Sequence, residues 1–93
     1  MNEGVRPIEQ YGQRIRTLRE RQQLEQQVLA ELTETTVEMI QRIESSIAHP
    51  SFSMIERLAH VLHVPYDHLL RHIWPPEVIR QHASSTLIDV PSS

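Results

Sequence analysis

Apolar residues recur in this chain in short blocks with helical spacing, and turn residues separate one block from the next. The first block covers residues 8–18, and Pro7 suits the start of a helix there. A second block covers residues 26–32. No segment alternates polar and apolar residues convincingly as a strand does, so the sequence predicts an all-α fold. The expected apolar faces are Ile8, Tyr11, Ile15 and Leu18 in the first block and Val28, Leu29 and Leu32 in the second.

The second half of the chain continues the helical pattern. Ser51 suits the N-cap of a fourth helix, and the Val64-Pro65 pair ends that helix. A fifth helix is expected over residues 66–74, where Pro75 stops it. The apolar set of the fourth helix is Ile55, Leu58, Ala59 and Leu62.

These blocks divide the chain into one domain with two short flanking segments. We expect an N-terminal arm at residues 1–7, a five-helix domain at residues 8–74 and a C-terminal extension at residues 75–93. Within the extension, residues 76–83 could form a short helix that begins at a proline, and residues 84–93 have the composition of a frayed tail.

The stretch TTVEMIQRIESS, from Thr35 to Ser46, has the pattern of a short helix with two different sides. Thr36 suits the N-cap, so the next residue would be the first helical one. At about 100° per residue, one side is apolar and would hold the helix to the core through Met39, Ile40 and Ile43. The other side would face a partner, and it carries Val37, Glu38, Gln41, Arg42 and Ser45.

Composition excludes several classes of protein. No apolar run approaches the ~18–20 residues of a membrane span, and the N-terminus lacks the apolar core of a signal peptide, so we expect a cytoplasmic protein with no membrane partner. The absence of cysteine excludes disulfides, thiolate zinc sites and a cysteine nucleophile. No catalytic motif or glycine-rich phosphate loop is present, so we expect neither an enzyme nor a cofactor.

The order of the blocks is similar to that of a known family. The segments GQRIRTLRE, LEQQVLAEL, TTVEMIQRIE and HPSFSMIERLAHVLHVP follow one another at the expected spacings. Together they resemble the lambda-repressor-like, Cro/Xre-type DNA-binding domains over roughly residues 11–70. The resemblance implies a five-helix fold in which the second and third helices form a helix-turn-helix, and it implies double-stranded operator DNA as the partner.

The resemblance also implies a role for individual residues of this chain. Gln26 would hold a DNA phosphate and brace the recognition helix, and Thr36 and Ser45 would help to position the DNA backbone. Glu44 would form a partly buried ion pair with Arg19, which makes it structural. The base-facing residues of the recognition helix would be Val37, Glu38, Gln41 and Arg42.

The chemistry of these four side chains matches base edges in the major groove. Arg42 can donate two hydrogen bonds to guanine, and Gln41 can pair with adenine. Glu38 can accept from the amino group of cytosine, and Val37 can pack on a thymine methyl. With no effector or catalytic domain in the sequence, repression of a promoter through a palindromic operator is the simplest function that the resemblance implies.

Charge leaves a second hypothesis open. The net charge is −3, and residues 25–49 hold five glutamates against one arginine, a net −4. The loop after the expected recognition helix, SSIAHP, contains neither lysine nor arginine, although cations supply much of the affinity for DNA. The alternative is a helix-turn-helix fold that binds another protein, as an antiactivator or an antitoxin-like partner does, through its acidic recognition face.

Three residues depart from the resemblance at turns. Glu34, Ser46 and His63 stand where the family commonly has glycine, at positions that can require a positive φ. A side chain at such a position costs up to about 1 kcal/mol relative to glycine. These departures are expected to alter turn angles rather than the fold.

The remaining features concern histidines and the C-terminal end. His68 and His72 are spaced i, i+4, and His60 and His63 are spaced i, i+3, but a zinc site needs a third ligand, so no metal site is expected. An apolar cluster near the end of the chain either completes the core or forms a dimer seam. We expect a homodimer, because helix-turn-helix repressors pair to meet two half-sites. The seam residues would be Ile73, Trp74, Val78 and Ile79.

Overall fold

The computed structural model describes residues 7–89, with side chains as far as His82. All regular elements in this range are helices, which confirms the all-α prediction. They are α1 (Tyr11–Arg21), α2 (Gln26–Leu32), α3 (Val37–Glu44), α4 (Phe52–Leu62), α5 (Tyr66–Ile73) and α6 (Pro76–Asp89). No helix among the described residues is both long enough and apolar enough to cross a membrane.

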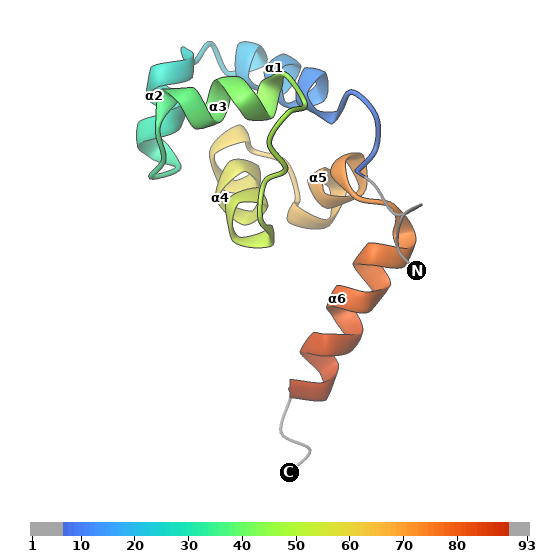
Figure 1. Ribbon diagram of the computed structural model, residues 1–93. Coiled ribbons are helices and arrows are strands. Elements are labelled where there is room, and N and C mark those ends of the chain that lie inside the picture. Colours follow the sequence, from blue (N-terminus) through green and yellow to red (C-terminus); the bar gives the residue numbers. More distant parts are fainter. Residues whose placement is uncertain (1–6, 90–93) are drawn as a thin grey trace.

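The first five helices form one body around a common core. Helices α1, α2 and α3 lie together on one side of this body, α4 and α5 lie on the other, and α6 projects away from it (Figure 1). Helix α3 packs on both α1 and α2, and α4 packs on α5. The fully buried aliphatic side chains at the centre are Ile15, Leu29, Ile40, Ile43, Ile55, Leu58, Leu62, Leu69 and Ile73.

Two of the helix starts have the caps that the sequence predicts. The hydroxyl of Thr36 accepts a hydrogen bond from the backbone N–H of Met39, at 3.1 Å. The hydroxyl of Ser51 accepts one from the N–H of Met54, also at 3.1 Å. Each bond satisfies a backbone donor that has no partner inside its helix, so α3 and α4 begin where the sequence predicts.

Left-handed backbone conformations occur at all three positions where the resemblance suggests glycine. Glu34, Ser46 and His63 have φ values of 61°, 61° and 60°. Gln10 and Gln23 also have positive φ, at 63° and 57°, and nothing in the sequence indicated these two. Each of the five ends or begins a helix with a turn that an L-residue adopts at a cost.

The start of α1 differs from the prediction. The helix begins at Tyr11 rather than near Pro7, because the left-handed conformation of Gln10 turns the chain just before it. Ile8 is 40% exposed and does not join the apolar stripe. Its backbone N–H instead donates a 2.7 Å hydrogen bond to the carbonyl of Ile73, which attaches the incoming segment to the end of α5.

The buried face of α2 also differs from the prediction. Leu29 is buried as expected, but Val28 and Leu32 are exposed. Ala30 and Thr33 are buried in their place, and the Thr33 hydroxyl donates to the carbonyl of Leu29 at 2.7 Å. The prediction followed the larger side chains, whereas a face with small residues lets α2 lie close to its neighbours.

Helix α6 is longer than the predicted short helix. It extends from Pro76 to Asp89, so residues 84–89, which were expected to be a frayed tail, are helical. The rest of the predicted tail, residues 90–93, and residues 1–6 of the predicted arm lie outside the described residues. In the middle of α6, the ring of His82 stacks on Phe52 of α4, with centroids 3.9 Å apart.

Candidate nucleic-acid interface

A buried carboxylate joins the first three helices. Glu44, at the C-terminal end of α3, has a fully buried side chain, and Arg19 of α1 donates to both of its oxygens. The Arg19 Nε–Glu44 Oε2 distance is 2.6 Å and the Arg19 Nη2–Glu44 Oε1 distance is 3.1 Å. Gln26, the first residue of α2, donates from Nε2 to Glu44 Oε1 at 3.0 Å. We call Arg19, Gln26 and Glu44 the Glu44 junction.

The junction compensates the cost of burying its charges. A carboxylate removed from water is strongly destabilising unless donors replace its hydration, and here Arg19 and Gln26 supply them, with a longer hydrogen bond of 3.5 Å from Arg16. The hydrogen bond to Glu44 and the nearby negative charge raise the pKa of Arg19, so the arginine stays charged. Arg19 Nη1 also donates to the carbonyl of Leu24, at 2.8 Å. The ion pair that the resemblance implied is therefore present, and it fixes the end of α3.

A glycine allows α1 and α3 to approach closely next to this junction. Gly12 is buried, and a methyl group built on it would overlap the carbonyl oxygens of Ile43 and Glu44. Its backbone N–H donates to the hydroxyl of Ser46 at 3.0 Å. Only hydrogen fits between these backbones, so the separation of the two helices depends on Gly12.

The two sides of α3 are close to the predicted ones, with one exchange. Ile40 and Ile43 are buried, but Met39 is 38% exposed and does not hold the helix to the core. Val37, predicted to be exposed, is half-buried and packs against the core. The buried residues of α3 include Glu44 as well as Ile40 and Ile43, so the buried side of the helix is centred on Ile40. Met39 is rotated about 100° around the helix axis from that centre, and it is therefore exposed.

The predicted base-facing residues otherwise lie on the exposed side of α3. Glu38, Gln41 and Arg42 are exposed, and so is Ser45, the residue just after the helix that was predicted to position the DNA backbone. Glu38 lies in the first turn, where the helix dipole favours a negative charge, and Arg42 lies in the last turn, where it favours a positive one. The structure brings these four side chains together on one face, and it separates them from the core.

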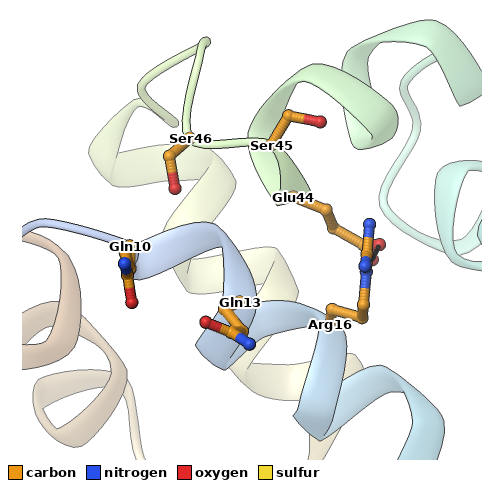
Figure 2. Close-up of a pocket in the computed structure, with 6 residues that line it drawn as sticks. All are labelled: Gln10, Gln13, Arg16, Glu44, Ser45 and Ser46. Atoms are coloured by element: carbon orange, nitrogen blue, oxygen red, sulfur yellow. Dashed lines mark hydrogen bonds and ion pairs between the residues drawn. The ribbon is translucent and has the colours of Figure 1, made fainter.

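A polar cleft of about 320 Å³ lies between the start of α1 and the end of α3. Figure 2 shows its six lining residues, with Gln13 and Arg16 from α1 and Ser45 from the end of α3 at its sides. The Arg16 side chain is 49% exposed, and its Nε lies 3.5 Å from Glu44 Oε1. We call this the α1–α3 cleft; the other three lining residues are Gln10, Glu44 and Ser46.

Arg16 is a residue that the sequence interpretation missed. The prediction sought phosphate-binding cations in the loop after α3, where the sequence has none. The concentration of arginines in the first helix was the available signal, because α1 packs against α3 and brings one of them to the cleft. Arg16 therefore adds an exposed cation next to the end of α3.

The predicted dimer seam is only partly accessible. Ile73 is completely buried in the core of its own chain, so it is excluded from such a seam. Trp74, Val78 and Ile79 are half-buried, and Trp74 and Ile79 pack against the core. The prediction grouped these residues by their apolar character, whereas Ile73 points inward with Leu69 and Leu70.

Comparisons with known proteins agree with this geometry. A family model described as a helix-turn-helix domain matches residues 10–73. No curated protein sequence matches the chain. Among solved structures, the restriction-modification controller protein C.AhdI from Aeromonas hydrophila is 30% identical, with a TM-score of 0.61, and the match covers 64% of this chain and 91% of that chain.

Two further structures are similar over nearly the same share of the chain. The N-terminal DNA-binding domain of SinR from Bacillus subtilis is 30% identical, with a TM-score of 0.60, and the match covers 64% of this chain and 88% of that chain. The P22 c2 repressor in complex with a synthetic operator is 25% identical, with a TM-score of 0.60, and the match covers 63% of this chain and 89% of that chain. These neighbours are lambda-repressor-like helix-turn-helix domains, as the sequence resemblance predicted.

Proposed function

The chain belongs to the helix-turn-helix domain family, and from this premise we propose that it is a sequence-specific DNA-binding transcriptional regulator that acts as a repressor. The segment of residues 36–45 would enter the major groove. One observation carries the proposal: the polar side of α3, with Glu38, Gln41 and Arg42, is exposed while its other side is fixed by the core and the Glu44 junction. A recognition helix needs this combination of a fixed backbone and accessible side chains.

Base recognition would depend mainly on Arg42. Its guanidinium can donate two hydrogen bonds to guanine O6 and N7, a contact that discriminates by roughly 1–3 kcal/mol. Gln41 offers the amide pair that matches adenine, and Glu38 offers an acceptor for the amino group of cytosine. Val37 retains part of its surface for contact with a thymine methyl.

Phosphate binding would come from the edges of this face. Arg16, in the α1–α3 cleft, supplies a cation whose side chain is 49% exposed, although its Nε also donates to Glu44, and Ser45 supplies a hydroxyl in the same cleft. Thr36 and Gln26 already have structural bonds within the chain, as a helix cap and as a donor to Glu44. We therefore propose that Thr36 and Gln26 act on DNA indirectly, because they fix the start of α3 and the start of α2. Backbone N–H groups at these two helix starts can donate hydrogen bonds to a phosphate.

We place this regulator in the cytoplasm, as a homodimer on a palindromic operator. Two half-sites lie about 34 Å apart along the DNA, and a dimer of this fold meets both. The partly exposed apolar residues at the joint of α5 and α6, Trp74, Val78 and Ile79, support a seam there. Helix α6 projects from the body beside this joint (Figure 1), which leaves it accessible to a second copy.

Titration of the purified chain against its own upstream DNA, at several salt concentrations, tests the proposal. We expect a sequence-specific complex at low salt that weakens as salt rises, because phosphate contacts release counterions. Arg42→Ala should cost roughly 1–3 kcal/mol and relax specificity at one base pair. Arg16→Gln should weaken binding to all sequences and reduce the salt slope by about 1.

Arg57→Gln is the matched control, because Arg57 is an exposed arginine on α4 that lies beside Leu32 and Glu34 and does not line the α1–α3 cleft. This variant should keep the base specificity of the unmodified chain, and the slope of its affinity against salt concentration should stay the same. Absence of any specific complex at low salt would eliminate the repressor proposal. Equal losses for Arg42→Ala and Arg57→Gln would show that the base-facing side of α3 is assigned wrongly.

A second candidate function is binding of another protein through the same face. Four of the five exposed large hydrophobic residues in the described part of the chain occur on α2, α3 and the loop that follows. Acidic side chains occur in the same segment, so the surface suits a basic partner with an apolar patch. The four residues are Val28, Leu32, Met39 and Ile47.

The DNA titration separates the two candidates. An antiactivator or antitoxin-like protein should give no specific DNA complex, and Met39→Ser and Leu32→Ser should then abolish partner binding while Arg42→Ala has little effect. A repressor should show the opposite pattern, with DNA binding sensitive to Arg42→Ala and tolerant of Leu32→Ser.

A further inference from the structure

Two histidines on α5 hold their ring nitrogens close together. His68 and His72 are one helical turn apart, and their Nε2 atoms are separated by 3.3 Å. The ring centroids are 4.8 Å apart, with an angle of 66° between the planes. His68 is exposed and His72 is half-buried, so water reaches the pair.

This separation matches the spacing of two ligands on one metal ion. Zinc and similar ions bind imidazole nitrogen at roughly 2.0–2.1 Å, and two such ligands in a tetrahedral arrangement lie about 3.3 Å apart. In the absence of metal, one imidazole donates its proton to the other. A metal ion would replace that proton, and the two nitrogens would keep nearly the same separation.

Helix α5 holds both rings in place. Leu69, Leu70 and Ile73 are buried on the opposite side of the helix and anchor it in the core. The i, i+4 spacing then places both imidazoles over the same turn. Because the backbone is already ordered, a metal ion would have to restrict only the two side chains.

We propose that His68 and His72 form an open two-histidine site for a divalent transition-metal ion, with water in the remaining coordination positions. The described residues contain no group of three or more histidine, aspartate or glutamate side chains that could enclose a metal. A closed structural zinc site is therefore not expected here, and affinity should follow the general order for nitrogen ligands, with Cu²⁺ bound more tightly than Ni²⁺ or Zn²⁺.

The charged residues near the two histidines affect how tightly the site binds a metal ion. Burial lowers the pKa of His72, and the positive charges of Arg14 on α1 and of His68 lower it further. The positive charge of Arg14 opposes an incoming cation, which favours an ion that binds nitrogen strongly. Asp67 and Arg71, on the same helix, are both highly exposed and lie 3.8 Å apart, so they offer little compensation.

This inference is independent of the proposed DNA binding. The site lies on α5, which packs on α4 and α1, whereas the proposed base-facing side chains lie on α3. Metal binding should therefore persist in Arg42→Ala, whatever that variant does to DNA.

Calorimetric titration of the tag-free full chain with CuCl₂, NiCl₂ or ZnCl₂ alone tests the proposal. We expect one Cu²⁺ per chain, and weaker binding of the other two ions. His68→Gln and His72→Gln should each weaken Cu²⁺ binding by more than about tenfold. His68 is exposed, so His68→Gln should remain folded, and circular dichroism checks this.

His60→Gln/His63→Gln is the matched control. These two histidines are exposed on and just after α4, and His63 has left the helical conformation, so they do not share a regular helical turn. The control should bind Cu²⁺ as the unmodified chain does, with nitrogen hyperfine structure from two imidazoles in its electron paramagnetic resonance spectrum. The proposal is overturned if the chain binds no Cu²⁺, if His68→Gln leaves binding unchanged, or if the control loses binding equally.

Discussion

The two sides of α3 differ in whether their polar side chains form hydrogen bonds and ion pairs within the chain. On the inner side, the Glu44 carboxylate accepts hydrogen bonds from Arg19 and Gln26, which come from two other helices. On the outer side, no side-chain hydrogen bond or ion pair involves Glu38, Gln41 or Arg42 within the described part of the chain. Stability and the proposed recognition are therefore carried by different residues of an eight-residue helix.

This difference explains how an acidic recognition face is compatible with a stable fold. Substitutions on the outer side change what the helix can bind, but they remove no internal contact. Substitutions on the inner side move or release the helix, and so they act on binding indirectly. Variants of the two sides should consequently separate in unfolding experiments.

The largest effect is expected for Glu44→Ala. It leaves Arg19 partly buried without its anionic partner, and breaking such a pair costs roughly 3–5 kcal/mol of unfolding free energy. Urea denaturation followed by circular dichroism measures the change. The matched control is Glu38→Ala on the outer side, which should stay within about 0.5 kcal/mol of the unmodified chain. Similar losses in the two variants would contradict the division of α3 into two sides.

A somewhat smaller effect is expected for Gly12→Ala. The added methyl group overlaps backbone carbonyl oxygens of α3, so α1 and α3 must separate, at a cost of about 1–3 kcal/mol. Thermal unfolding measures this cost, and Gln13→Ala, on the exposed side of the same helix, is the control. An unchanged midpoint for Gly12→Ala would mean that the close approach of the two helices has no part in stability.

The smallest effect, and a favourable one, is expected for Glu34→Gly. Glu34 has φ 61°, a conformation that costs a residue with a side chain about 1 kcal/mol, and glycine removes that cost. Glu34→Gln keeps the strained backbone but removes the charge, so it should not raise the urea midpoint as Glu34→Gly does. If the two variants stabilise equally, charge repulsion around α2 and α3 is the cause rather than the backbone.

Much of the fold could be predicted because the relevant signals are local. Proline and the capping residues Thr36 and Ser51 act on the backbone next to them, so the starts of α3 and α4 follow from the sequence. The positive φ of Glu34, Ser46 and His63 was expected from positions where the family has glycine. No local signal of this kind marks Gln10 and Gln23, and the start of α1 was therefore placed too early.

The candidate site was predicted less completely because it depends on several helices. Met39 was assigned to the buried side by its apolar character, but the burial of Glu44 shifts the inner side toward Val37. Arg16 was overlooked because its place next to α3 depends on the packing of α1 against that helix. For similar reasons, Ile73 was assigned to a surface although it is buried.

The sequence by itself determined the helical blocks, the caps that begin α3 and α4, and the residue types available on the recognition helix. These depend on side-chain and backbone preferences over one or two turns. Only the tertiary structure decided which residues flank Leu29 on the buried side of α2 and Ile40 on that of α3, and which arginine lies beside the end of α3. The packing of α1 against α3 at Gly12 and the shared hydrogen bonds of Glu44 set these relations, because they join residues far apart along the chain.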